Sequence, residues 1–122
     1  MGSYLKIDEV EFCSKSTSSF IESVIHEVVG PPLKTVNEDV MWCLTKRDVA
    51  AIVMHIQSML LDQKEFYEFA KRFSDRIWVT SHTQTEFQIL ITHLKNYVVP
   101  NLTNIALKMT VEDRPVVVAT WI

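Results

Sequence analysis

The chain of 122 residues is 48% hydrophobic and 22% charged, with a formal net charge of −3 at pH 7. This composition suits one domain with a substantial apolar core and excludes a wholly disordered chain. Because neither half of the chain is strongly basic, we expect no nucleic-acid partner. No apolar run approaches the roughly 20 residues needed to cross a bilayer, so we expect no membrane association either.

Glycine and cysteine are both scarce. Residues 1–3 are interpreted as a remnant of cloning, which leaves Gly30 as the one glycine in the body of the chain. Phosphate-binding loops, dinucleotide fingerprints and nucleophile elbows all need glycines at sharp bends, so none is expected here. Cys13 and Cys43 form no Cys-x-x-Cys pair and no signal peptide opens the chain. We therefore expect an intracellular protein of the cytoplasm or nucleus.

The first segment with some regularity, residues 4–12, alternates only partly at the period of a β-strand. We interpret it as a short helix or an extended segment packed on the rest of the protein. The first clear helix covers residues 20–29, where apolar side chains recur on one side. It should end at Gly30-Pro31-Pro32, because glycine adopts the left-handed conformation of a helix end and proline cannot continue a helix.

Signals for helix starts recur along the chain. In each, a capping side chain precedes an acid by three residues, which is the spacing of a capping box. The four segments are Ser-Phe-Ile-Glu (19–22), Thr-Val-Asn-Glu (35–38), Thr-Lys-Arg-Asp (45–48) and Asp-Gln-Lys-Glu (62–65).

From these starts and the apolar periodicity we predict helices over 36–44, 46–61, 63–78 and 83–99. Pro100 should kink the last of these or begin a further helix through 101–109. Residues 116–122 are rich in β-branched side chains, so this end is again either a short helix or an extended segment.

Short links between so many helices predict an all-α protein. We expect a helical bundle, or a short module of stacked helical repeats, with about six helices and ends that are helical or extended. Residues 4–122 are interpreted as a single interaction domain, either complete or part of a longer chain.

The helix predicted over 46–61 has more apolar surface than one core contact needs. Its main stripe contains Val49, Ile52, Val53, Ile56, Met59 and Leu60. A second strip contains Ala50, Met54 and Leu61, well away from the first. Either this is the central helix of the bundle, covered from both sides, or the second strip meets another chain.

Two further places could contact a partner. On the helix predicted over 63–78, Tyr67, Lys71 and Trp78 fall on one flank, where aromatic and basic side chains could bind a peptide. The apolar C-terminus around Trp121 is the other. With Met54 and Leu61, these residues are the predicted binding residues for a partner helix or for a second copy of the chain.

No pattern of catalytic or metal-binding residues is recognisable. The four histidines, His26, His55, His82 and His93, lack metal-site spacing, and His55 falls on the polar side of its helix. Cys43 has no histidine at a recognisable distance and is interpreted as a buried small apolar residue. We therefore expect no catalytic residue, no cofactor and no metal.

Three functional hypotheses remain, in decreasing order of support. The first is a non-catalytic protein interaction domain, a scaffold or adaptor, that presents an apolar helical surface to a partner helix or to itself. The second is a compact adaptor of about six helices, of the kind used in cell-death or innate-immune signalling or by its viral mimics. The third is an enzyme whose histidine, cysteine and acidic residues are brought together only by folding.

Overall fold

The computed structural model describes residues 4–12, 15–32, 34–36, 39–72 and 84–121. Its elements, in chain order, are β1 (Tyr4–Ile7), β2 (Val10–Phe12), α1 (Lys15–Val28), β3 (Lys34–Val36), β4 (Asp39–Leu44), α2 (Lys46–Leu61), α3 (Gln63–Arg72), α4 (Gln84–His93), the π-helical turn η1 (Leu94–Val98), α5 (Val99–Glu112) and β5 (Val116–Trp121).

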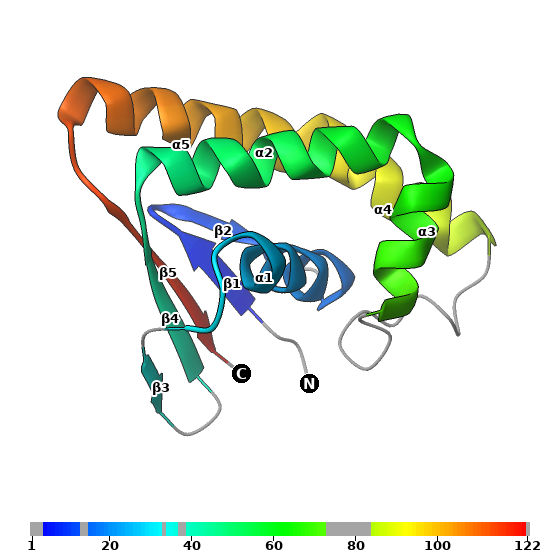
Figure 1. Cartoon of the computed structure of the whole chain (residues 1–122), viewed down its shortest axis with the longest axis horizontal. Helices are drawn as coiled ribbons and strands as arrows, with labels where there is room; N and C mark the ends of the chain where they lie inside the picture. The colour runs from blue at the N-terminus through cyan, green and yellow to red at the C-terminus, as the bar shows by residue number, and fades with distance from the viewer. Residues whose placement is uncertain (1–3, 13–14, 33, 37–38, 73–83, 122) are drawn as a thin grey trace.

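The strands form one antiparallel sheet of five, in the order β2-β1-β5-β4-β3. Two local hairpins, β1-β2 and β3-β4, are joined by β5, which pairs with β1 on one side and with β4 on the other. The prediction of an all-α bundle of about six helices is therefore wrong, and the fold is a mixed α/β fold. The first and last described elements, β1 and β5, are strands that lie next to each other in the sheet (Figure 1).

The helix predicted over 36–44 is the clearest error, because Val36 ends strand β3 and residues 39–44 form strand β4. Trp42 and Leu44 are buried, whereas Met41 and Cys43, which alternate with them along the strand, are exposed. Side chains of successive strand residues point to opposite faces of a sheet. Since both faces of β4 carry apolar residues, its alternation could not be recognised in the sequence.

One face of the sheet is covered by helices. Its buried residues are Leu5, Ile7, Phe12, Trp42, Leu44, Val116 and Val118. Helix α1 lies between this face and the pair formed by α2 and α5, which run side by side (Figure 1). On the opposite face Met41, Cys43 and Val117 are exposed, and we call this the open sheet face.

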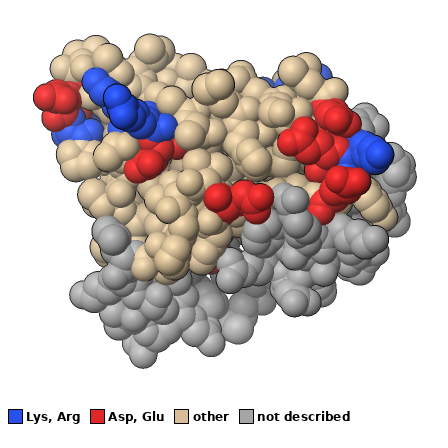
Figure 2. Space-filling view, viewed as in Figure 1, with Lys and Arg blue, Asp and Glu red and all other residues tan. Residues whose placement is uncertain are grey.

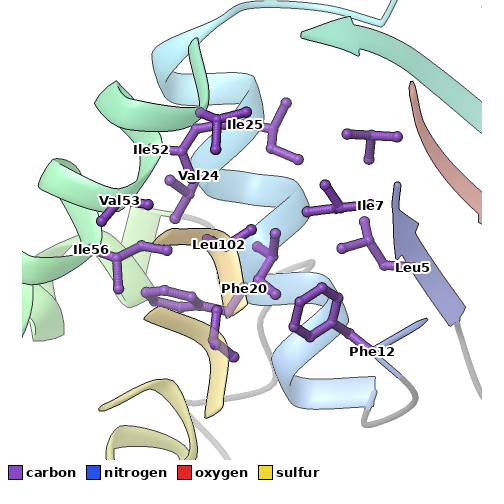
Figure 3. Close-up of a cluster of buried hydrophobic side chains, with 14 of the residues drawn as sticks. Leu5, Ile7, Phe12, Phe20, Val24, Ile25, Ile52, Val53, Ile56 and Leu102 are labelled. Atoms are coloured by element: carbon purple, nitrogen blue, oxygen red, sulfur yellow. The ribbon is translucent and has the colours of Figure 1, made fainter. Parts of the chain in front are cut away.

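The central helix of the protein is α1 and not α2. Phe20, Ile21, Val24 and Ile25 of α1 are all fully buried. Figure 3 shows Phe20, Val24 and Ile25 between the strands and the inner face of α2. The Phe20 ring stacks on Phe66 of α3 at 5.3 Å between centroids. Because α1 separates α2 from most of the sheet, α2 needs only one buried face.

Several predicted helix ends are found. Gly30 has a φ of 112° and its N–H donates to Ile25 O, which ends α1 as the Gly-Pro-Pro segment predicts. Thr45 and Asp48 form the predicted capping box of α2, and Asp62 Oδ1 accepts from the Lys64 and Glu65 amides at the start of α3.

Helices α4, η1 and α5 follow one another without a break, and Pro100 lies in the first turn of α5, so the further helix predicted at Pro100 is found and is continuous with the one before it. Proline has no N–H and its ring collides with the carbonyl four residues earlier. The wider π turn accommodates this, with Val99 N–H donating to Leu94 O and the side-chain Nδ2 of Asn101 donating to Tyr97 O at 2.7 Å. Among the described residues, no helix is both long enough and apolar enough to cross a bilayer.

Candidate interaction surface

The second apolar strip of α2 lies on the outside of the molecule. Met54 is 69% exposed and Leu61 is 90% exposed, while the main stripe of the same helix, Val49, Ile52, Val53, Ile56 and Met59, is buried. The two predicted stripes are thus found, and the alternative in which α2 is covered from both sides is wrong for this chain.

The other predicted binding residues do not join this strip. Tyr67 is exposed on α3, but α3 runs across the end of α2 rather than along it (Figure 1). Lys71 belongs to the last turn of α3 and Trp121 to the end of β5, where its backbone pairs with Tyr4. The side chains of Lys71 and Trp121, and all of Trp78, lie outside the described residues.

Helix α5 extends the exposed strip of α2, which the sequence analysis missed. Leu107 is 61% exposed and Val111 is 84% exposed, whereas Leu102, Ile105 and Met109 of the same helix are buried. At about 100° per residue, Leu107 and Val111 fall on one line with Pro100 and Thr103, opposite the buried residues. Leu107 and Val111 are an i, i+4 apolar pair on the side of α5 opposite its buried residues. This pair was the sequence signal that could have added α5 to the predicted surface.

We define the α2–α5 surface as the adjoining outer strips of these two packed helices. Its residues are Ala50, Met54, Gln57 and Leu61 of α2 with Pro100, Thr103, Leu107 and Val111 of α5, all exposed. It contains no ionisable side chain. Figure 2 shows the upper part of the molecule, over α2 and α5, largely without charge, with charged side chains toward its two ends.

Charged side chains lie at both ends of α2. Lys46 and Arg47 are exposed at its start, and Asp62 and Glu65 are exposed at its end, where α3 begins. Asp48 also belongs to the first turn, but it is turned about 160° from Ala50 and is held by the capping box. Each end is of mixed sign, because Lys64 is exposed beside Asp62 and Glu65, and Asp113, also exposed, lies near Lys46.

An ionic cluster holds the end of α5 to the first hairpin. Nη1 and Nη2 of Arg114 donate to the two carboxylate oxygens of Asp8 at 3.1 and 3.2 Å, and Lys108 Nζ lies 3.8 Å from the same carboxylate. Arg114 also bonds Glu112. The guanidinium of Arg114 lowers the pKa of the Asp8 carboxyl from its ordinary value, and the same bonds raise the pKa of Arg114.

A depression lies beside η1. It is lined by Gln88, Ile89, Thr92, His93, Asn96 and Tyr97. The His93 ring stacks on Tyr97 at 5.0 Å, and the Tyr97 hydroxyl donates to Glu11 O at 3.4 Å. These contacts fix the wall of the depression against the β1-β2 hairpin, and its described lining contains no carboxylate and no thiol.

The histidines and Cys43 are distributed over separate parts of the fold. His26 lies against Trp42, His55 against Phe69 and His93 against Tyr97. His55 is half-buried, with a buried Nε2 that has no hydrogen-bond partner, rather than on a solvated polar face. Cys43 is exposed on the open sheet face, so the interpretation of a buried residue is wrong. His82 lies outside the described residues.

In the described part of the chain, no three His, Cys, Asp or Glu side chains are grouped as metal ligands would be. No known family model matches the sequence, and no curated protein or solved structure is significantly similar to it. The chain's function must therefore be argued from its own surface.

Proposed function

We propose that this protein is a non-catalytic interaction module that binds another protein through the α2–α5 surface. The observation that carries the proposal is the exposure of Met54, Leu61, Leu107 and Val111 on two adjoining helices with no ionisable side chain among them. Scattered exposed apolar residues are ordinary, but a contiguous apolar area with a charged rim is typical of protein interfaces.

The geometry of the two helices also favours a protein partner. Between two helices packed side by side runs a shallow groove, into which the side-chain ridge of another helix can fit. Burial of the four apolar side chains would remove them from water, which is the main favourable contribution to association. We place this binding inside the cell, in the cytoplasm or nucleus.

The two other hypotheses have less support. The compact adaptor of cell-death or innate-immune signalling was proposed for an architecture of about six helices, and this chain has a five-stranded sheet instead. An enzyme would need acids and bases that converge on one cavity. The three described histidines instead lie against three different aromatic side chains.

The test is capture of binding proteins from cell extract by the immobilised chain. The double substitution Met54→Glu and Leu61→Lys should abolish specific capture, because charges forced into an apolar interface lose hydration without gaining partners. A matched control makes the same kind of change at two other exposed apolar residues, Ile89→Glu and Val117→Lys. The proposal would be overturned if the Met54→Glu and Leu61→Lys variant still captured the binding proteins and the Ile89→Glu and Val117→Lys control did not.

A further inference from the structure

The chain has five methionines, and the four that the structure describes lie in very different surroundings. Met59 of α2 and Met109 of α5 are each 1% exposed, so dissolved oxidants do not reach their sulfur atoms. Met54 of α2 is 69% exposed and Met41 of β4 is 43% exposed. Among the described residues, Met54 and Met41 are therefore the two methionines that are open to oxidation, and Met54 is the more accessible.

Met54 lies near the middle of the α2–α5 surface. Helix α5 runs antiparallel to α2, because Asp113, just after α5, lines the same small cavity as Thr45, just before α2. The exposed Val111 is therefore near one end of the surface, and Leu61 is at the other. Residues at the centre of an interface are the most completely desolvated on binding and contribute the most to affinity. A change of polarity at Met54 should thus affect binding more than the same change at the rim.

We propose that Met54 is an oxidation site through which a peroxide weakens binding at the α2–α5 surface. This inference rests on the proposed function, since it concerns the regulation of the same surface. The peroxide transfers one oxygen atom to the Met54 sulfur, which loses two electrons, and hydrogen peroxide is itself reduced to water. The product is methionine sulfoxide, which is polar where the thioether was apolar. Methionine sulfoxide reductases reverse the reaction.

The sulfoxide leaves the fold intact, because the Met54 side chain lies outside the core. On the free protein, water donates hydrogen bonds to the new S–O group. A partner that buries Met54 against apolar side chains removes this water without supplying a donor, and an unsatisfied buried polar group is costly. We therefore expect the affinity for the partner to fall by about tenfold or more.

Met41 provides the internal comparison. It reacts in the same sample, but it lies on the open sheet face, on the opposite side of the sheet from the helices. Its sulfoxide is therefore outside the α2–α5 surface. If oxidation acts through Met54, the modification of Met41 should leave binding unchanged.

The experiment oxidises the immobilised chain with hydrogen peroxide. Catalase then removes the peroxide and a thiol reductant restores oxidised cysteines, so that cell extract, the probe, meets a chain modified only at methionine. Mass spectrometry should find sulfoxide at Met54 and Met41 and unmodified Met59 and Met109. Circular dichroism should be unchanged, and capture from the extract should fall by about tenfold or more.

Two matched variants locate the effect, each compared with its own untreated sample. Met54→Leu keeps an apolar side chain of similar volume and has no sulfur to oxidise, so peroxide should not reduce its capture. Met41→Leu retains Met54, so its capture should fall on oxidation as that of the wild type does. Methionine sulfoxide reductases should restore capture by oxidised Met41→Leu, which tests the same point without a change at residue 54.

The inference is wrong if Met54 is not oxidised in the folded chain. It is also wrong if capture survives complete conversion of Met54 to the sulfoxide, if Met54→Leu loses capture on oxidation as the wild type does, or if the reductases restore nothing.

The two proposals can fail separately. If the oxidised wild type still captures proteins that the Met54→Glu and Leu61→Lys variant does not, regulation by oxidation is wrong and the proposed function stands. If that double variant captures as well as the wild type, the proposed function is wrong, and the inference drawn from it fails with it.

Discussion

The carboxylate of Asp8, in the turn between β1 and β2, accepts two hydrogen bonds from the guanidinium of Arg114, in the link between α5 and β5. Two parallel bonds between these planar groups fix their relative orientation as well as their separation. Asp8 also has a φ of 57°, a left-handed conformation that aspartate and asparagine tolerate better than most residues. The contact therefore holds the first hairpin against the last strand of the sheet.

Asp8→Asn should lower the free energy of unfolding by about 1 kcal/mol, since the amide keeps the shape and the backbone preference but loses one of the two charge-assisted bonds. Urea denaturation followed by circular dichroism measures the change. Glu9→Gln is the matched control, because the Glu9 side chain is 85% exposed. A control variant as unstable as Asp8→Asn would show that net charge, and not the paired bonds, is responsible.

The same contact predicts a pH dependence. Arg114 lowers the pKa of Asp8 in the folded protein below the ordinary value of 3.8, so the carboxyl contributes stability above that value. This contribution is lost as the pH falls below 3.8 and through the lower pKa of the folded state. The difference in unfolding free energy between the wild type and Asp8→Asn should be constant near neutral pH and shrink on acidification. A difference that grows at low pH would contradict the assigned contact.

The sequence predicted correctly those elements whose stabilising interactions lie between residues close together in the chain. Helix α2 occupies the predicted residues 46–61 because the Thr45–Asp48 capping box and the apolar periodicity act within a few turns of chain. The strands depend on pairing between distant segments: β5 lies between β1 and β4, and neither neighbour is close to it in sequence. A local capping pattern before residue 39 therefore predicted a helix where pairing with β5 makes a strand.

The α2 half of the α2–α5 surface could be predicted from the sequence, because it too depends on local periodicity. Two stripes on α2 follow from periodicity, but which stripe faces the core depends on α1, which lies against the inner stripe. The contribution of α5 depends on the antiparallel packing of two helices separated by α3 and α4 along the chain. The sequence alone carries no direct signal of that packing.

Substitution of Phe20 tests the packing of the core. Its fully buried ring contacts Phe66 at 5.3 Å and Phe69 at 5.4 Å, so Phe20→Ala leaves a cavity between α1 and α3. We expect a loss of about 3–5 kcal/mol, measured by thermal or urea unfolding. Ile89→Ala, at a residue that is 63% exposed, should change stability by less than about 0.5 kcal/mol.

Two other core substitutions follow from the periodicity of the sequence. Leu94→Ala should cost on the order of 2–5 kcal/mol, because Leu94 is fully buried at the π turn. The same loss is expected for Phe73→Ala from the sequence pattern, although Phe73 lies outside the described residues. A melting temperature unchanged by Leu94→Ala would contradict the placement of η1 against the core.

The open sheet face predicts an accessible thiol. Cys43 is exposed between the buried residues Trp42 and Leu44, so a water-soluble thiol reagent should label it in the folded protein. Cys43→Ser removes that reaction, and mass spectrometry of the labelled peptide identifies the site. Labelling of Cys43 only after denaturant is added would mean that the face is covered in solution.

The register of α2 can be tested with neighbouring positions. Met54 and Leu61 are exposed, so the Met54→Glu and Leu61→Lys variant should remain folded, with an unfolding free energy within about 0.5 kcal/mol of the wild type. Ile56→Glu places the same charge only two residues from Met54, but Ile56 is fully buried. A buried carboxylate without a partner costs several kcal/mol, a large part of the typical 5–15 kcal/mol of total stability. Circular dichroism should therefore show a helical double variant and a largely unfolded Ile56→Glu protein, whereas an unfolded double variant would place the strip in the interior and remove the surface on which the proposed function depends.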